Sequence, residues 1–287
     1  EVVARGGEAL PVPCDVADEH AVFAAAERAV EVFGGIDVWI NNAMTTVFSP
    51  VSQLRTEEFR RVTEVGYFGC VFGTMAGLQQ MRRQGDGMIL QVGSALAYRG
   101  IPLQAAYCGA KHAARGFTDS LRTELLHDKS RIALTAVHLP GMDTPQFDWG
   151  RTRFRHRPRP AGMVLAPEAA AAAVIRAIER PAREYWVGAQ TAITIIGNML
   201  APSIADRYLA HNAVEGQRGD TEIAADRPDN LFTPVTGAGL HRTRGSFSEE
   251  ARPKALALRA APLPLTVALI VMLIMAGIGF VLGTALG

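Results

Sequence analysis

The sequence predicts an α/β protein built on a doubly wound parallel sheet, and two observations carry this prediction. Short apolar runs alternate along the chain with longer segments of helical periodicity, which is the pattern of βαβ units. The runs are apolar throughout instead of alternating with polar residues, as expected for strands that helices cover on both faces. With 287 residues, of which 48% are hydrophobic, the chain has enough apolar material for a substantial core.

Each element follows from local signals. Strands are expected at residues 9–13, 36–41, 88–92 and 132–139, with a last short strand at 184–188. Helices are expected between them, at residues 19–33, 56–83, 104–128 and 167–179. Asp18 is a suitable N-cap for the first of these helices, and Pro167 fits the first turn of the last one, where a missing N–H costs nothing.

The composition changes after residue 188. Residues 189–207 are apolar and compatible with a helix, whereas residues 215–259 are rich in Gly, Pro, Asp, Arg and Ser and predict a linker. Residues 262–287 carry no charge, and the apolar run 265–286 is long enough to cross a bilayer, which takes about 20 residues. The sequence therefore predicts a C-terminal membrane anchor, with a terminal helix docked on the protein or on a partner subunit as the alternative.

The charges indicate where the chain would act. Arg252, Lys254 and Arg259 precede the apolar run, and cationic residues beside a span prefer the cytoplasmic side. We therefore expect the part before the anchor to face the cytoplasm, with an unanchored cytoplasmic protein as the alternative. The whole chain has 29 basic and 28 acidic residues, so no global field exists that would recruit nucleic acid.

The three cysteines exclude two kinds of site. Cys14, Cys70 and Cys108 are far apart in the sequence and form no CxxC pair. This spacing argues against a disulfide framework and against a structural zinc site, and we expect no metal.

Ligands of open parallel sheets bind beyond the carboxyl ends of the strands, so the residues that follow each predicted strand are candidates for chemistry. Three short motifs stand there. They are Asn41-Asn42-Ala43, Gly93-Ser94 and Pro140-Gly141.

Tyr107 and Lys111 lie in the helix that follows Ser94, and their spacing of four places them on one helical face. Free tyrosine has a pKa of about 10, and a general acid or base works best near the operating pH, so a downward shift of about 3 units is wanted. A neighbouring ammonium lowers the pKa of a phenol. Tyr107 is therefore the predicted proton-transfer group, and the Ser94 hydroxyl is expected to hydrogen-bond the substrate oxygen.

These motifs together resemble the short-chain dehydrogenase/reductase family. The stretches NNAMTTVFSP, QVGSALAYRGIPLQAAYCGAKHAARGFTDSLRTEL and HLPGMDTPQF carry the resemblance, which covers about residues 1–190. It implies a Rossmann-like catalytic domain over residues 1–190, followed by an extension and linker at 191–261 and the anchor at 262–287. It also implies hydride transfer between nicotinamide and a carbonyl or alcohol, with Ser94, Tyr107 and Lys111 catalytic, and NADP in preference to NAD by family habit.

The resemblance further implies roles for cofactor-binding residues. Asp15 and Val16 would flank the adenine ring, although Asp15 also fits a simple helix-capping role. Lys111, beside Tyr107, would hold the hydroxyls of the nicotinamide ribose. The remaining residues that would support the cofactor are Asn41, Asn42, Ala43, Pro140, Gly141 and Thr144.

The sequence departs from the family in two places. The glycine-rich phosphate loop and the first strands of the family would lie upstream of Glu1, so we expect a sheet that lacks its first strands and a chain that is inactive alone. The family's helix asparagine, which supports a proton-relay water, would fall at Gly66. Glycine has no side chain for this task, and we assign no catalytic asparagine.

Several alternatives stay open. A cofactor-binding sensor or scaffold without turnover competes with the enzyme, whereas an epimerase or dehydratase lacks room for its usual substrate domain. The arginine run at 151–160 fits a solvated loop better than a site for an anionic substrate or lipid headgroups, and His138 fits a packed residue better than a catalytic one. By resemblance, helices that begin near Thr56 and Gln104 would form a homo-oligomer.

Two features indicate the class of substrate. The expected membrane anchor favours an apolar alcohol or ketone, and so do the apolar side chains of the loop after the fourth strand. These side chains are Met142, Phe147, Trp149 and Met163.

Overall fold

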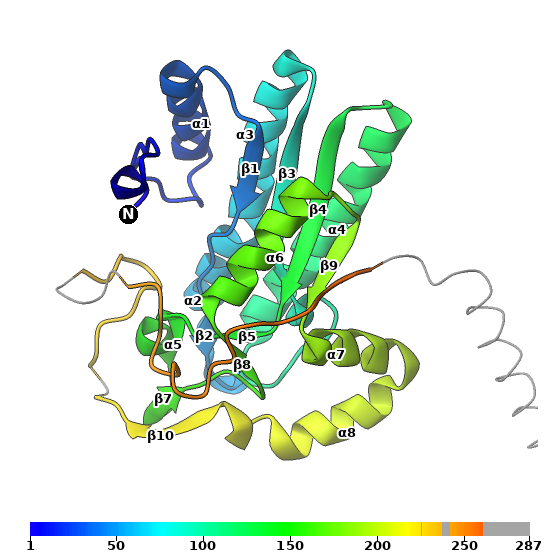
Figure 1. Cartoon of the computed structure of the whole chain (residues 1–287). Coiled ribbons are helices and arrows are strands. Elements are labelled where there is room, and N and C mark those ends of the chain that lie inside the picture. The colour runs from blue at the N-terminus through cyan, green and yellow to red at the C-terminus, as the bar shows by residue number, and fades with distance from the viewer. Residues whose placement is uncertain (225, 237–241, 261–287) are drawn as a thin grey trace, which may run out of the picture.

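The computed structural model describes residues 1–224, 226–236 and 242–260 of the chain. Its main sheet has five strands in the order β1-β3-β4-β9-β11 (Figure 1). They are β1 (Val38–Asn41), β3 (Gly87–Ser94), β4 (Ile132–Leu139), β9 (Glu184–Val187) and β11 (Ala257–Arg259). The first four are parallel, and β11 pairs antiparallel with β9. The carboxyl ends of the parallel strands therefore meet at one edge of the sheet.

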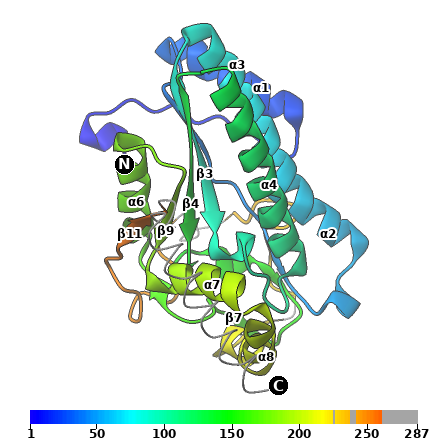
Figure 2. The same cartoon turned by 90° about the vertical axis from the view of Figure 1, so that its right-hand side faces the viewer.

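Helices cover both faces of this sheet (Figure 2). One face carries α6, and the other carries α1, α3 and α4. The helices are α1 (Glu19–Phe33), α2 (Thr56–Thr63), α3 (Gly69–Gln84), α4 (Ala105–His127), α5 (Gln146–Trp149), α6 (Pro167–Glu179), α7 (Ala189–Leu200) and α8 (Pro202–Asn212). As predicted, the Asp18 carboxylate caps α1 by accepting a hydrogen bond from Ala21 N, and Pro167 occupies the first turn of α6.

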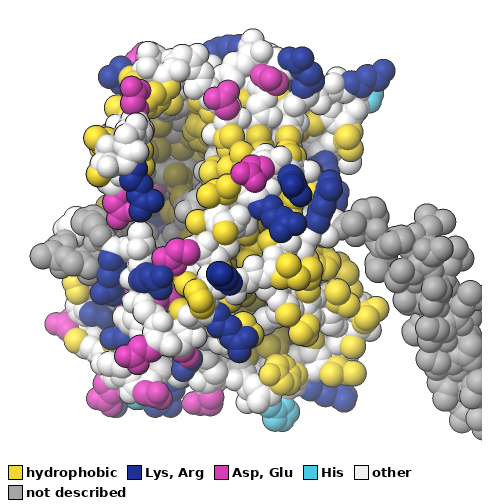
Figure 3. Space-filling view, in the orientation of Figure 1, with side chains coloured by type: hydrophobic (Ala, Val, Ile, Leu, Met, Phe, Trp, Pro, Cys, Tyr) yellow, Lys and Arg dark blue, Asp and Glu magenta, His cyan; other side chains and the backbone are white. Residues whose placement is uncertain are grey.

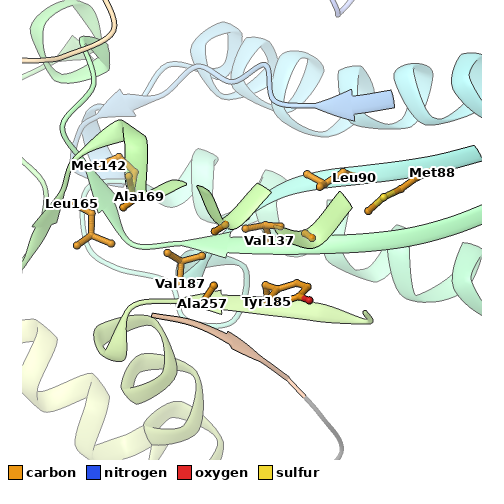
Figure 4. Close-up of a cluster of buried hydrophobic side chains, with 11 residues drawn as sticks. Met88, Leu90, Val137, Met142, Leu165, Ala169, Tyr185, Val187 and Ala257 are labelled. Atoms are coloured by element: carbon orange, nitrogen blue, oxygen red, sulfur yellow. The ribbon is translucent and has the colours of Figure 1, made fainter. Parts of the chain in front are cut away.

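The packing on the α6 face depends on small side chains. Ala169, Ala173 and Ala177 recur at every fourth position of α6, so they form one stripe that is buried against the sheet. Figure 4 shows Ala169 within this cluster of buried side chains. Val137 of β4 and Tyr185 of β9 belong to the same cluster and are 0% and 2% exposed. Burying a large apolar side chain contributes about 1.5–3 kcal/mol, so this layer is a main source of stability.

Short strands and two helices lie beyond the carboxyl edge of the sheet, at the bottom of Figure 1. The strands are β2 (Val47–Phe48), β5 (Gly141–Met142), β6 (Arg151–Thr152), β7 (His156–Pro158), β8 (Val164–Leu165) and β10 (Arg218–Glu222). They pair as β2 with β6, β5 with β8 and β10 with β7. Together with α7 and α8 they enclose the region where the predicted catalytic residues lie.

The predicted α/β class and the parallel sheet are confirmed, but the strand expected at residues 9–13 is wrong. These residues form no strand. Pro11 and Pro13 have no N–H to donate to a sheet, and no strand of the described ranges pairs with this segment. The predicted helix at 56–83 is interrupted as well, because a π-helical turn at Glu64–Phe68 joins α2 to α3.

The segment expected to be a linker, residues 215–259, is instead part of the fold over its described residues. It contributes β10 and β11, and Arg252 N donates a hydrogen bond to Val164 O in β8 at 3.0 Å. The Ser248 hydroxyl donates to the Asp143 carboxylate at 2.6 Å. The lack of periodicity in this segment therefore does not indicate a flexible linker. Backbone pairing and polar contacts hold the segment to the rest of the fold.

The apolar run at 265–286 lies outside the described residues, so the predicted membrane anchor stays a prediction. Among the residues that are described, no helix combines the length and the apolar character that a membrane span requires.

Candidate active site

Ser94 ends β3 at the carboxyl edge of the sheet, and its backbone geometry is set by the turn that follows. Its hydroxyl accepts a hydrogen bond from Leu96 N at 3.1 Å, at the start of a 3-10 turn at Ala95–Ala97. The side chain is 7% exposed. Ser94 is thus presented on a rigid element beside α4.

Tyr107 and Lys111 lie one helical turn apart in α4, as the spacing predicted. The Lys111 ammonium is 5.7 Å from the centroid of the Tyr107 ring and donates a hydrogen bond to Val92 O at 2.8 Å. Tyr107 lies close enough to Ser94 for the Ser94 side chain to lower the pKa of the phenol, and both residues line the same cavity. The three predicted catalytic residues therefore lie together at the junction of β3 and α4.

The junction separates two cavities. Ser94 and Tyr107 line a cavity of about 590 Å³, whose other walls come from the loop after β4 and from α7 and α8. Lys111 and Gly93 line a second cavity of about 230 Å³ on the side of β1. Figure 3 shows a hollow with apolar walls on this β1 side of the molecule. A molecule in the smaller cavity could therefore meet a molecule in the larger one at this junction.

The structure brings most of the predicted cofactor residues to these cavities. Asn41, Asn42, Ala43 and Val16 line the smaller one. The amide of Asn41 is tied inward, because its Nδ2 donates to Thr74 and Gln91 and its Oδ1 accepts from Trp39 Nε1 at 2.8 Å. Asn41 thus shapes the wall of this cavity with its side chain held in place.

The remaining predicted cofactor residues divide into two groups. Pro140 and Gly141 line the larger cavity, next to Ser94 and Tyr107. Asp15 and Thr144 line neither cavity. Asp15 forms an ion pair with Arg61 at 2.8 Å. A Cβ at Gly245 would lie 2.6 Å from Thr144 O, so the C-terminal segment covers Thr144.

The residues of the smaller cavity fit the nicotinamide end of a dinucleotide. A buried ammonium at Lys111 matches sugar hydroxyls, which are neutral acceptors that do not require a second charge. Small residues at Ala43, Gly66 and Gly69 leave the cavity open to a flat ring. Among the described residues, no group of three His, Cys, Asp or Glu side chains is placed to hold a metal ion.

The pKa of Tyr107 differs from the sequence-based expectation. Burial raises the pKa of Tyr107 to about 12, although the Ser94 side chain acts in the lowering direction. Lys111 does not produce the expected downward shift, because its ammonium is directed to Val92 O and burial lowers its own pKa. The phenol is therefore protonated at neutral pH, which is the form that can donate a proton.

Gly66, which stands where the family has its helix asparagine, has a packing role. It lies in the π-helical turn and is buried, and a Cβ at this position would come 3.1 Å from the Cβ of Ala110 in α4. Ala110 directly precedes Lys111. A larger residue would have to displace α4 at the position that carries the predicted catalytic pair.

The arginine run at 151–160 is neither a solvated loop nor a free anion site. Arg151 and Arg153 bind the carboxylate of Glu58, which is 0% exposed, with contacts of 3.1 and 2.6 Å. Arg159 pairs with Glu250 at 2.8 Å. The run thus fastens the loop that covers the larger cavity to α2 and to the C-terminal segment.

Replacing Glu58 by glutamine should lower the free energy of unfolding by about 3 kcal/mol at neutral pH. The hydrogen bonds from Arg55 N, Arg153 and Arg151 outweigh the effect of burial and lower the pKa of Glu58 from 4.5 to about 2. A lowered carboxyl pKa stabilises the fold above the unfolded value of 4.5, and this contribution disappears as the pH falls towards 2. Urea unfolding at several pH values should therefore show the difference between wild type and variant shrinking in acid.

Glu57→Gln is the matched control, because the neighbouring Glu57 side chain is 58% exposed and, within the described part of the chain, pairs only with Arg55. Surface ion pairs contribute about 0–1 kcal/mol, so this variant should unfold almost like the wild type. Equal effects of the two substitutions would show that the Glu58 cluster does not hold the loop.

Sequence reasoning missed the far wall of the larger cavity. Ile193 and Thr194 of α7 and Ile204, Tyr208 and Leu209 of α8 line it. The available signal was the apolar, helix-compatible character of residues 189–207, but periodicity alone does not tell which cavity a helix closes.

Comparisons with known proteins bear on the fold and the family of the chain. A family model described as short chain dehydrogenase matches residues 1–151. The uncharacterized oxidoreductase YxnA of Bacillus subtilis is 30% identical over 274 residues, which are 94% of this chain and 76% of that protein. The putative oxidoreductase SadH of Mycobacterium tuberculosis is 35% identical over 141 residues, and the match spans 49% of this chain and 51% of SadH.

Two solved structures share the fold. A short-chain dehydrogenase from Streptomyces avermitilis has a TM-score of 0.58 at 23% identity, with 75% of this chain and 83% of that chain covered. An alcohol dehydrogenase from Thermococcus sibiricus, complexed with 5-hydroxy-NADP, has a TM-score of 0.55 at 24% identity, with 64% of this chain and 76% of that chain covered. At these identities the likeness concerns the Rossmann-like fold alone.

Proposed function

Because the chain belongs to the short-chain dehydrogenase family, we propose that it is an NAD(P)-dependent oxidoreductase that acts on a carbonyl or alcohol. The observation that carries the proposal is the position of Tyr107 and Lys111. They are neighbours on one face of α4, yet Lys111 faces the smaller cavity and Tyr107 faces the larger one. A cofactor and a substrate in these two cavities would meet beside the phenol.

Each side chain has a defined task in this reaction. Bound nicotinamide would supply or accept the hydride. Ser94 donates a hydrogen bond to the substrate oxygen, and Tyr107 donates the proton that this oxygen needs when a carbonyl is reduced. Lys111 holds the sugar next to the ring. The phenol, whose pKa burial raises to about 12, is protonated at neutral pH, which is the form that the reduction of a carbonyl requires.

We further propose that the substrate is apolar. The cavity beside Ser94 has a volume of about 590 Å³, enough for a molecule of many carbon atoms. Most of the side chains around it are apolar. Those of Phe48, Leu96, Phe147, Ile193 and Ile204 are examples. NADP stays the preferred cofactor by family habit, and a homo-oligomer and the cytoplasmic-facing anchor stay predictions.

A panel assay tests the function against the alternative of a sensor that binds cofactor without turnover. The protein is mixed with NADPH or NADH and with ketones and aldehydes of increasing chain length, and loss of the reduced nicotinamide absorbance is followed. We expect kcat/KM to increase with chain length by up to about fifteenfold for every two added methylene groups, since each buried CH₂ contributes about 0.8 kcal/mol. Tight binding of a cofactor without turnover on any carbonyl would favour the sensor.

A further inference from the structure

Three buried polar side chains lie beside Ser94 and have no part in the proposed reaction. Tyr98 follows the turn after Ser94, His138 lies near the end of β4, and Glu184 begins β9. They are 9%, 2% and 4% exposed. Buried ionisable groups are costly to keep, so this cluster needs an explanation beyond packing.

His138 is hydrogen-bonded to the backbone of Ser94. Its Nδ1 lies 3.1 Å from Ser94 O, and because a carbonyl oxygen can only accept, Nδ1 carries the proton. The ring fits closely, since a Cβ at Gly93 would come within 2.5 Å of this same nitrogen. Glycine at position 93 is thus the residue that lets the imidazole reach the Ser94 carbonyl.

Glu184 holds the other side of the cluster. Its Oε2 accepts hydrogen bonds from the Tyr98 hydroxyl and from Trp186 Nε1, the latter at 3.0 Å, and lies 3.6 Å from His138 Nε2. Burial raises the pKa of Glu184, whereas the hydrogen bonds from Tyr98 and Trp186 and the nearby Arg183 guanidinium lower it, and the pKa is below its usual value. Glu184 is therefore an ionised acceptor at neutral pH.

Other charged groups face the cluster from α4. The Arg115 guanidinium lies 3.8 Å from the centroid of the Tyr98 ring, and Lys111 lines the same cavity as His138 and Glu184. Burial lowers the pKa of His138, and these two cations lower it further against the opposing effect of Glu184. The imidazole is thus neutral at neutral pH, with its proton on Nδ1.

The contacts close around one short turn. Ser94 O at its start is bound by His138, and the Tyr98 hydroxyl at its end is bound to Glu184. His138 also contacts Tyr98 directly, with the rings edge to face and their centroids 5.2 Å apart. Residues 94–98, which present the Ser94 hydroxyl, are therefore clamped between β4 and β9.

We propose that His138 and Glu184 are positioning residues that fix the turn 94–98 and so place the Ser94 hydroxyl for hydrogen bonding to the substrate. The expected effect on the reaction rate rests on the proposed function. The rigidity of the turn 94–98 does not depend on the proposed function. Misplacement of a reacting group by about 1 Å costs about 10²-fold in rate, so the kinetic effect of a loose turn is measurable.

Three substitutions of His138 separate its hydrogen bond from its bulk. Asparagine places an amide N–H where Nδ1 lies, glutamine places one near Nε2, and leucine removes the donor. We expect kcat to fall about 10²-fold in His138→Leu and His138→Gln and to stay within about threefold of wild type in His138→Asn. His112→Asn in α4 is the matched control, because its Nδ1 also contacts a backbone carbonyl, Cys108 O at 2.8 Å, but on the exposed side of the helix.

Hydrogen exchange of the Leu96 amide gives a readout that needs no turnover, since this N–H donates to Ser94 Oγ. Protection should fall at least about tenfold in His138→Leu and be retained in His138→Asn. Tyr98→Phe, which removes one hydroxyl only, should also lower the protection of the Leu96 amide. This variant replaces His138→Leu in the test if His138→Leu does not fold. Unchanged exchange in His138→Leu or, if that variant does not fold, in Tyr98→Phe would overturn the inference. If the Leu96 amide loses protection in these variants but the wild type reduces no carbonyl, the inference about the turn stands and the proposed function is wrong.

Discussion

Replacing Tyr107 by phenylalanine should lower kcat by about 10³-fold and leave the Kd of the cofactor within about threefold. The phenol lines the larger cavity beside Ser94 at the junction of the two cavities, and the substitution removes its hydroxyl alone. Lys111 keeps its bond to Val92 O, so the cofactor side is not disturbed. Steady-state turnover and cofactor fluorescence titration measure the two quantities separately.

Tyr67→Phe is the matched control for this experiment. Tyr67 lies in the π-helical turn next to Gly66, and its ring contacts that of Phe68 with the centroids 5.2 Å apart, while it lines neither cavity. The same loss of one hydroxyl there should leave kcat within about twofold. Turnover that survives in Tyr107→Phe would require another proton donor, and the proposed mechanism would be wrong.

The parts of the fold that were predictable are those with a local signal. The bounds of α1, α6 and β4 agree with the prediction, because Asp18, Pro167 and an uninterrupted apolar run mark them. The strand expected at residues 9–13 has the right apolar character, but a strand exists only with a partner beside it. Whether a segment pairs with a neighbouring strand depends on the whole sheet, so the residues of the segment alone do not predict it.

The site divides in the same way. Ser94, Tyr107 and Lys111 could be found because two of them share a helical period and the third ends a strand. The clamp of His138 and Glu184 joins positions 46 residues apart in sequence on neighbouring strands, and the Glu58 cluster joins α2 to a loop more than 90 residues later. No periodicity links such positions. Only the arrangement of the elements brings these side chains together.

The pKa of Tyr107 also could not be predicted from the sequence alone. The sequence places a lysine one turn away, which predicts a lowered phenol pKa. Burial is the larger effect and has the opposite sign, and it becomes visible only when α4 packs against β3. A spacing rule identifies which groups interact, but desolvation decides the direction of the shift.

Replacing Lys111 by methionine should lower kcat/KM by about 10³-fold without lowering the free energy of unfolding. Methionine keeps most of the length of the stem and removes the ammonium of a residue that is 9% exposed. Burial lowers the pKa of Lys111 below 10.5, which means that the fold disfavours the charged form. The unfolded chain then binds the proton more tightly, so wild-type stability should rise with pH as the pH approaches 10.5, and the methionine variant should lack this rise.

Lys254→Met controls for the loss of a positive charge, because Lys254 is exposed and lines neither cavity. It should change neither kcat/KM nor stability beyond about 0.5 kcal/mol. Urea unfolding of both variants from neutral pH to pH 10 decides between two roles for Lys111. If Lys111→Met unfolds more easily in proportion to its loss of activity, the ammonium is a structural partner of Val92 O. If activity collapses while stability holds or rises, the protein keeps a buried charge that costs it free energy, and binding the cofactor beside Tyr107 is the reason for keeping it.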